Sequence, residues 1–307
     1  MMRHLLRDDD LTPQEQAEVL DLAAAVKAAP FSLRPLEGPQ SVAMIFDKPT
    51  LRTQTSFAAG IAELGGHAML VDGTLAGIGL RESIEDVARV LGGQARQVVW
   101  RTAGQERIEV MAEYAGVPVI NALTDEFHPC QLLADLLTVR ERFGRTAGLT
   151  AAFLGDGACN MGNSWLLAGA TAGVHVRISS PDGYQPEQQY VDRAADIAAS
   201  TGGSARVVVD PREAVAGADI VITDTWVSMG KEAEAAGRLA DLARYSLTEG
   251  LFALASPDAI AMHCLPAYRG KEIAAAVLDG PRSVIWDEAE NRRHAQKAVM
   301  AWLEARR

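Results

Sequence analysis

The stretch Val42-Ala43-Met44-Ile45-Phe46 is a short apolar run, and the polar stretch Asp47-Lys48-Pro49-Thr50-Leu51-Arg52-Thr53 follows it directly. A run of this length, bounded by polar residues and proline, is typical of a buried strand. The residues from about 53 to 64 then have the pattern of a helix. Strand, polar loop and helix in this order are the repeating unit of a parallel α/β fold.

The same alternation continues along the chain and defines two α/β domains. Strands are expected near residues 42–46, 68–71, 98–100, 117–120, 149–154, 174–178, 205–209, 220–223, 259–262 and 284–285. Helices are expected near residues 13–27, 53–64, 84–91, 106–114, 129–143, 187–200, 270–278 and 288–306. The first helix opens with a capping box, Thr12-Pro13-Gln14-Glu15. We therefore expect the fold class α/β, with two parallel-sheet α/β domains and the active site in the interdomain cleft.

The expected domain boundaries follow from the restart of the alternation after residue 146. The first domain is expected at 1–146 and the second at 147–286. Residues 287–307 are expected to form a C-terminal helix that packs back on the N-terminal domain, because no strand follows it.

Composition and charge exclude several classes of protein. The chain has 307 residues, of which 48% are hydrophobic, so it is long enough for two domains with separate cores. A formal net charge of −11 argues against nucleic acid or an anionic membrane as the main partner. The N-terminus lacks the apolar core of a secretory signal peptide, and no apolar run of roughly 18 residues occurs. We expect a cytoplasmic protein that is neither exported nor membrane-spanning.

The three cysteines, Cys130, Cys159 and Cys264, lack the paired spacing of a zinc site. Their odd number also argues against a disulfide framework and favours a reducing compartment. We expect no structural metal.

Cationic and polar side chains follow the strands of the first domain. They are Thr50, Arg52, Thr53, Arg101, His128 and Gln131. Because the carboxyl ends of parallel strands meet at one edge and helix N-termini favour anions, we expect one strong anion there, with a hydrogen-bonding oxygen beside it. The alternatives are helix capping by Thr50 or Thr53, a solvated Arg101, and packing roles for His128 and Cys130.

A thiol lies at a strand end of the second domain, in the stretch Met262-His263-Cys264-Leu265-Pro266. Ligands of open parallel sheets bind beyond the carboxyl ends of the strands, which favours a functional role for Cys264. The alternative is a buried structural cysteine beside a satisfied core histidine, His263.

A rival interpretation comes from Gly155-Asp156-Gly157, which follows an expected strand and resembles a dinucleotide-binding turn. Asn160 takes the place of the third glycine, and Asp182 lies about where a ribose-binding acid is expected. A nucleotide-dependent oxidoreductase would leave the polar residues of the first domain unexplained.

Five segments, in this order, resemble those of the ornithine carbamoyltransferases, within the aspartate/ornithine carbamoyltransferase superfamily. They are Lys48-Pro49-Thr50-Leu51-Arg52-Thr53, Trp100-Arg101-Thr102, His128-Pro129-Cys130-Gln131, Asp224-Thr225-Trp226-Val227-Ser228-Met229-Gly230 and His263-Cys264-Leu265-Pro266. The resemblance covers nearly the whole chain. It implies a carbamoyl-phosphate domain and an amino-acid domain joined by two linking helices, in a homotrimer or an assembly of trimers with active sites at subunit borders.

The resemblance also implies roles for individual residues. The carbamoyl-phosphate ligands would be Thr50, Leu51, Arg52, Thr53, Gly77, Arg101, His128, Gln131, Cys264, Leu265 and Arg292. The ornithine ligands would be Asn160, Asp224, Ser228 and Met229, and the residues engaged in catalysis would be Arg101, His128, Asp224 and Cys264. The segment Ser228-Met229-Gly230-Lys231 is expected to form a mobile loop that closes over ornithine.

The implied reaction is direct attack of the neutral δ-amine of L-ornithine on carbamoyl phosphate, giving citrulline and phosphate, as in arginine biosynthesis. Asp224 alone would favour the charged amine, so it is expected to orient ornithine, while Cys264 or the phosphate accepts the proton. No metal or other cofactor is needed.

Two departures from the family pattern stand out. Leu51 and Gln54 replace a threonine and an arginine, and Gly77 stands where many relatives carry a glutamine that reaches a neighbouring subunit. Ala267, in place of an arginine, argues against aspartate as the substrate. The alternatives are another amine, such as putrescine or an N-acylated ornithine, and a non-catalytic relative.

Overall fold

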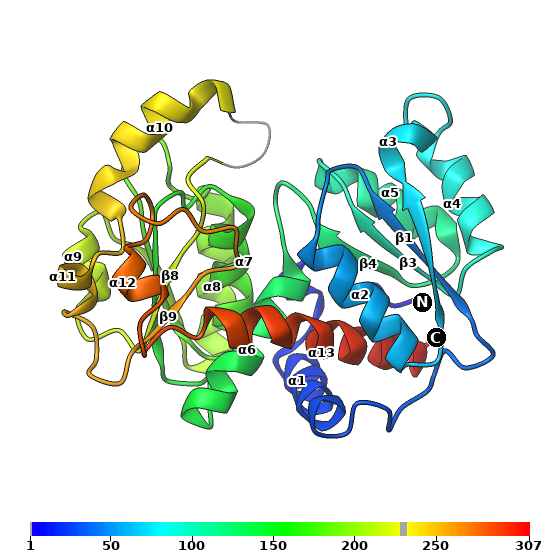
Figure 1. The fold of residues 1–307 in the computed structure, drawn as a ribbon, viewed down its shortest axis with the longest axis horizontal. Helices are drawn as coiled ribbons and strands as arrows, with labels where there is room; N and C mark the ends of the chain where they lie inside the picture. Colours follow the sequence, from blue (N-terminus) through cyan, green and yellow to red (C-terminus); the bar gives the residue numbers. More distant parts are fainter. Residues whose placement is uncertain (1, 228–231) are drawn as a thin grey trace. The chain divides into compact units, whose positions relative to one another are not determined.

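The structure is a computed structural model that describes residues 2–227 and 232–307 of the chain (Figure 1). The chain divides into two compact units, each described here by itself. Unit 1 comprises Met1–Leu137 and Glu290–Arg307, and unit 2 comprises Thr138–Ala289. The chain passes from one unit to the other within two helices, α6 (Pro129–Phe143) and α13 (Ile285–Glu304).

Unit 1 contains a four-stranded sheet in which every neighbouring pair is parallel, in the order β2-β1-β3-β4. The strands are β1 (Ser41–Phe46), β2 (His67–Asp72), β3 (Gln97–Arg101) and β4 (Val119–Leu123). The helices are α1 (Pro13–Ala28), α2 (Arg52–Glu63), α3 (Gly73–Ala76), α4 (Ile84–Gly92) and α5 (Gln105–Ala115). A short 3-10 helix, η1 (Asp8–Asp10), precedes them.

The burial of the strands in unit 1 follows their position in the sheet. Five of the six residues of β1 are buried, as expected for a parallel strand covered on both faces. The edge strand β2 has no buried residue, and Leu70 on it is 55% exposed. The capping box at Thr12 is confirmed, because the Thr12 hydroxyl accepts from the backbone of Glu15 and the Glu15 carboxylate accepts from Thr12.

Part of α13 belongs to unit 1 and packs between α1 and α2 (Figure 1). The Lys297 ammonium is fully buried there and donates to the carbonyl oxygens of Val26 and Pro30 at 3.2 and 3.0 Å. It also pairs with the carboxylate of Glu63 on α2. A buried cation is stable because these acceptors replace its water.

Unit 2 contains a five-stranded parallel sheet in the order β7-β6-β5-β8-β9. The strands are β5 (Thr150–Leu154), β6 (His175–Ser179), β7 (Ser204–Val207), β8 (Ile220–Thr223) and β9 (Ile260–Met262). The helices are α7 (Asn160–Thr171), α8 (Gln188–Thr201), α9 (Pro211–Val215), α10 (Ala235–Leu242), α11 (Glu249–Phe252) and α12 (Ala275–Leu278). Two short 3-10 helices complete the unit, η2 (Glu232–Glu234) and η3 (Ala243–Tyr245).

Two expected elements of the second domain differ from the structure. The strand expected at 284–285 is wrong: one bridge joins Ala261 to Ser283, and α13 then begins at Ile285. The helix expected at 270–278 is reduced to α12, because residue 270 has a positive φ and its N–H donates to the carbonyl of Ile273 in a turn.

No helix in the described part of the chain is both long and apolar enough to span a membrane.

Candidate active site

In each sheet the order of the strands reverses at a switch point, and several of the predicted ligand residues follow the two strands that flank it. In unit 1 the chain order reverses between β1 and β3, where Phe46 pairs with Arg101 at the carboxyl edge. In unit 2 it reverses between β5 and β8, where Leu154 pairs with Thr223. Switch points are where open α/β sheets bind ligands.

The loop after β1 opens α2 without a side-chain cap. Leu51 occupies the N-cap position, its side chain is 74% exposed, and no side chain accepts a capping hydrogen bond. The structure therefore contradicts the alternative that Thr50 or Thr53 caps this helix. The uncapped N-terminus gives an anion-binding position.

Two arginines converge on Thr53, which is fully buried. Arg101 Nη1 lies 3.3 Å from Thr53 Oγ1 and 3.4 Å from Thr50 Oγ1. Arg292, on α13, donates from Nη2 to the same Thr53 hydroxyl at 3.0 Å. We name this group, together with Arg52 and His128, the anion site.

The charges of the anion site act on His128, a buried residue just before α6. Burial, and then the positive charges of Arg292, Arg101 and Arg52, hold the pKa of His128 well below its ordinary value. His128 is thus a neutral imidazole at pH 7, which suits it to donate a hydrogen bond to a carbonyl oxygen.

The neighbours of His128 on α6 have different surroundings. Gln131 donates from Nε2 to Asp135 Oδ1 at 2.8 Å, and both residues are buried. Cys130 donates to the Asn121 carbonyl at 3.4 Å, and burial raises the pKa of its thiol to about 12. Cys130 is a packing residue, as one sequence alternative had it. Gly77, the remaining predicted ligand of unit 1, ends α3 with a φ of 63°.

A second cluster, the thiol site, lies at the carboxyl ends of β8 and β9. Because Ile222 pairs with Met262, the next residues along these strands bring Asp224 beside Cys264. The Cys264 thiol donates to Asp224 Oδ1 at 3.1 Å. Burial raises the pKa of the Asp224 carboxyl, although His263, the thiol and the Thr225 N–H oppose it. Asp224 therefore holds a proton more readily than an exposed aspartate.

His263 supports the turn that follows Cys264. Its ring is buried, its Nδ1 accepts from the Leu265 N–H at 2.9 Å, and its Nε2 lies 3.4 Å from Glu272. The His263 N–H donates to Glu288 at 3.0 Å. Leu265 has a φ of 61°, which is rare for a branched residue, so the histidine holds a strained turn. Sequence reasoning missed both glutamates, because nothing local marks them as partners of His263.

The Asp224 carboxylate, the His263 ring and the Cys264 sulfur offer ligand atoms within 4.8 Å of one another. This donor set suits a borderline-soft divalent cation, so it is the group of described residues that could hold a metal. Within this cluster the thiol donates its proton to Asp224.

Asn160 begins α7, after the turn that suggested a dinucleotide site. The backbone N–H groups of that turn are already donated: Gly155 to the Ser179 carbonyl at 3.0 Å, and Gly157 to the Ser180 hydroxyl at 3.0 Å. The next N–H, of residue 158, donates to the carbonyl of residue 184 at 2.9 Å. A pyrophosphate would need these donors, so the structure disfavours the nucleotide interpretation.

A buried ion pair joins this turn to the segment after β8. Arg238 on α10 pairs with Asp156, and their side chains are 7% and 5% exposed. Arg238 Nε also donates to the Trp226 carbonyl at 2.6 Å, and its guanidinium lies 5.1 Å from the centre of the Tyr184 ring. The sequence offered no local indication of this pair. The predicted ligands Ser228 and Met229 lie outside the described residues.

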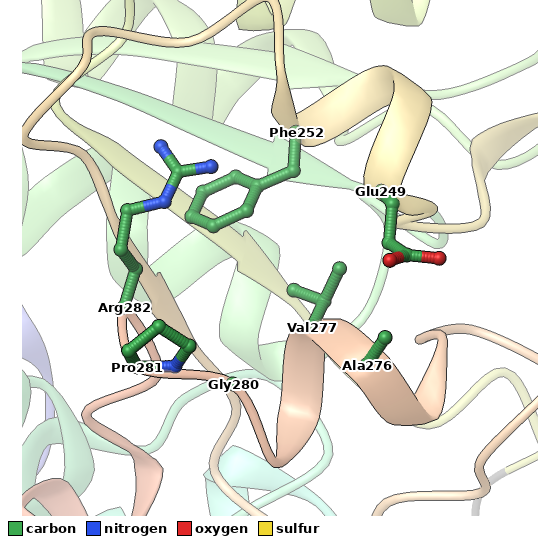
Figure 2. A pocket seen from close by; sticks show the side chains of 7 residues that line it. All are labelled: Glu249, Phe252, Ala276, Val277, Gly280, Pro281 and Arg282. Atoms are coloured by element: carbon green, nitrogen blue, oxygen red, sulfur yellow. The ribbon is translucent and has the colours of Figure 1, made fainter.

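A pocket of about 250 Å³ lies elsewhere in unit 2, between α11 and α12 (Figure 2). The Arg282 guanidinium lies 4.0 Å from the centre of the Phe252 ring, and Val277 of α12 completes the wall. Arg282 also contacts the carbonyls of Ser256 and Pro257, which precede β9. This pocket contains no predicted ligand residue and belongs to the opposite edge of the sheet.

Comparisons with known proteins match the whole chain. The carbamoyl-P binding domain of aspartate/ornithine carbamoyltransferases matches residues 3–141, and their Asp/Orn binding domain matches residues 147–303. An ornithine carbamoyltransferase of Clavibacter michiganensis is 61% identical over 303 residues, 99% of each chain. One of Rhodococcus opacus is 54% identical over 100% of this chain and 98% of its own.

Solved structures agree with these matches. The anabolic ornithine carbamoyltransferase of Campylobacter jejuni superposes with a TM-score of 0.94 at 34% identity over all of both chains. The enzyme of Pyrococcus furiosus gives a TM-score of 0.92 at 41% identity, over 97% of this chain and 96% of its own.

Proposed function

The chain belongs to the aspartate/ornithine carbamoyltransferase family, and we propose that it transfers the carbamoyl group of carbamoyl phosphate to the δ-amine of L-ornithine. The products are L-citrulline and phosphate. The observation that carries the proposal is the anion site, where Arg101 and Arg292 converge on Thr53 beside an uncapped helix. Cations and a helix N-terminus in one place match the phosphate of carbamoyl phosphate.

In unit 1, carbamoyl phosphate is held by phosphate and carbamoyl contacts. The phosphate takes the backbone of Thr50, Leu51, Arg52 and Thr53, with the Arg52 and Arg101 side chains. The neutral His128 donates to the carbamoyl oxygen, and Gln131 and Arg292 complete this end. Developing negative charge on the oxyanion and the leaving group meets these preorganised donors, which lowers the barrier.

In unit 2, ornithine is held through its α-carboxylate by Asn160 and through its α-ammonium by Asp224. Ser228 and Met229 complete this set. These side chains provide an acceptor for an α-ammonium and a donor for an α-carboxylate, as an amino acid requires. Putrescine lacks both the α-ammonium and the α-carboxylate, and N-acylated ornithine lacks the free α-ammonium. Ornithine is therefore preferred to either amine.

The reaction needs the δ-amine in its neutral form. If its pKa is near that of lysine, about 10.4, neutrality at pH 7 costs about 4 to 5 kcal/mol. The amine nitrogen attacks the carbonyl carbon, the carbon–oxygen bond to phosphate breaks, and the electron pair leaves with phosphate. The proton from nitrogen passes either to the Cys264 sulfur, after the thiol's own proton has moved to the Asp224 carboxylate, or to a phosphate oxygen. Burial of Asp224 supports the first route, because a carboxylate with a raised pKa accepts the thiol proton more readily.

The assembly we propose is a homotrimer that forms through unit 1. Four apolar side chains of unit 1 are each more than half exposed. They are Leu70 on β2, Leu75 on α3, Leu80 in the loop between α3 and α4, and Val90 on α4. An exposed apolar group of this kind on an edge strand and its neighbours fits a second copy of the chain. Gly77 lies in the same loop, so the loop would face the neighbouring subunit.

The remaining assignments are also proposals. We place the protein in the cytoplasm and in arginine biosynthesis, and we keep 1–146, 147–286 and 287–307 as its domain boundaries. The net charge of −11 supports small-molecule substrates over nucleic acid or membrane partners.

A citrulline assay tests the proposal. We expect citrulline from carbamoyl phosphate and ornithine, at a kcat/KM at least on the order of 100-fold above that for aspartate, putrescine or N-acetylornithine. Asp224→Ala should abolish the activity, whereas Asp182→Ala, which removes an exposed carboxylate of the same unit, should retain it. A folded protein that makes no citrulline would refute the proposal and favour a non-catalytic relative.

A further inference from the structure

A polar cluster that is partly exposed at Asp47 and Arg107 lies where the loop between β1 and α2 begins. Asp47, the first residue after β1, accepts at Oδ1 from Trp100 Nε1 at 3.1 Å and at Oδ2 from the Thr102 hydroxyl at 2.6 Å. Arg107 of α5 donates from Nε to the Thr102 hydroxyl at 2.8 Å, and its Nη2 lies 3.5 Å from Asp47 Oδ2. The Asp47 N–H donates to the Arg101 carbonyl at 3.0 Å.

The same cluster fastens the loop that follows β2. Arg107 Nη2 donates to the Ile78 carbonyl at 2.9 Å, and the Thr74 hydroxyl donates to the Asp47 carbonyl at 3.1 Å. A Cβ at Gly73 would lie 1.9 Å from Asp47 Oδ1, so the carboxylate packs directly on this backbone. Three segments thus meet at one carboxylate and one guanidinium.

We propose that Asp47 and Arg107 are positioning residues for carbamoyl phosphate. They hold the loop between β1 and α2 in place relative to Arg101, without touching the ligand. Asp47 begins the loop that carries Thr50 and leads into α2, and Thr102 directly follows Arg101. The distance between the loop hydroxyls and the Arg101 guanidinium therefore depends on the bonds between Asp47 and Thr102. The inference rests on the proposed function, in which carbamoyl phosphate is the ligand of the anion site.

The hydrogen bonds to Asp47 matter for stability because their donors are buried. Trp100 and Thr102 are fully buried, so water cannot replace the carboxylate as acceptor for the indole N–H and the hydroxyl. If Asp47 or Arg107 changes, the end of β3 must shift to satisfy these groups, and Arg101 shifts with it. Misplacement of a ligand-holding group by about 1 Å can lower activity by up to on the order of 100-fold.

Arg107→Gln, Arg107→Lys and Asp47→Asn test the inference. The control is Arg89→Gln, which removes another arginine of unit 1 that pairs with an acid, Asp86 at 3.0 Å, and lies over a ring, Tyr114 at 4.8 Å. For each protein we would measure the KM of both substrates, kcat, the Kd of inorganic phosphate by calorimetry and the thermal midpoint.

We expect Arg107→Gln and Asp47→Asn to raise the carbamoyl phosphate KM and the phosphate Kd about tenfold, with the ornithine KM within about twofold of the parent. Arg107→Lys keeps the charge but loses the planar guanidinium that reaches three acceptors, so its increase should be smaller, about threefold. Arg89→Gln should match the parent in every constant.

The inference is overturned if Arg107→Gln lowers only the thermal midpoint, or if both KM values rise together. Should Arg107→Gln fail to fold, Arg107→Lys decides the matter, and an unchanged carbamoyl phosphate KM would overturn the inference. Failure of the proposed function has a separate signature, since the parent protein would then make no citrulline. The phosphate Kd of the variants would still decide whether Asp47 and Arg107 position the anion site.

Discussion

Replacement of Arg238 by methionine should destabilise unit 2 severely. The substitution keeps a long apolar side chain but removes the pair with Asp156 and the bond to the Trp226 carbonyl at 2.6 Å. Asp156 would then remain as a buried carboxylate, since its side chain is only 5% exposed. The loss of stability comes mainly from this unpaired buried charge and less from the lost attraction between the two side chains.

The magnitude follows from burial. Breaking a buried ion pair by removing one partner costs about 3–5 kcal/mol. For a unit of this size each kcal/mol lowers the melting temperature by roughly 2–4 °C, so the expected loss is roughly 6–20 °C. In the double variant Arg238→Met with Asp156→Asn no charge is buried, and we expect it to recover at least about 2 kcal/mol relative to the sum of the single changes.

Differential scanning calorimetry of the four proteins would measure these midpoints. The control is Arg244→Met, because Arg244 is 67% exposed and lies 3.8 Å from Asp210, and a surface pair contributes about 1 kcal/mol at most. The reasoning is refuted if Arg238→Met lowers the midpoint no more than Arg244→Met does. Strict additivity of the two changes at Arg238 and Asp156 would also contradict it.

Four further predictions concern single residues. Cys264→Ala should lower kcat on the order of 100-fold while carbamoyl phosphate still binds, and unchanged turnover in steady-state kinetics would remove the thiol from the mechanism. Arg52→Ala should abolish carbamoyl phosphate binding by calorimetry, and retained affinity would contradict its placement in the anion site. Burial, and then the neighbouring cations, lower the pKa of His294 to about 4; because the unfolded value is higher, its stabilising contribution is present above about pH 6.5 and is lost as the pH falls toward 4. The free energy of unfolding, measured with urea, should therefore fall by about 2 kcal/mol between pH 7 and pH 5. In the His294→Gln protein it should fall by distinctly less. The buried thiol of Cys130, with a pKa of about 12, should resist a thiol reagent until the protein unfolds, and fast labelling of the native protein at this residue would argue against its burial.

Much of the fold could be predicted from the sequence because parallel strands are short apolar runs between polar loops. Nine of the expected strands correspond to β1 to β9, and their ends differ by at most three residues, the largest difference being at the end of β4. The expected strand at 284–285 failed because residue 284 directly precedes α13 and residue 285 is the first residue of that helix. Apolar runs of two residues do not distinguish a strand from the buried start of a helix.

Most of the anion site was predictable as a group, because its members follow neighbouring strand ends, whereas Arg292 of α13 came only from the family resemblance. Its support was not predictable: Asp47 and Arg107 are separated by 60 residues, and Asp156 and Arg238 by 82. Such pairs depend on sheet register and on helix packing, which local patterns do not specify. Residues with a local pattern were found, and their partners from distant segments were missed.

The left-handed backbone of Leu265 has a consequence for engineering and for natural selection. A φ of 61° at a residue with a Cβ costs roughly 1–2 kcal/mol, and glycine would adopt it without that cost. Glycine would, however, lose the packing of Leu265 against the apolar core of unit 2 and would add freedom to the unfolded chain, and these losses offset the relief of strain. A library screened only for folded protein should therefore not enrich Leu265→Gly. Backbone strain alone is thus a poor guide to stabilising substitutions at this position.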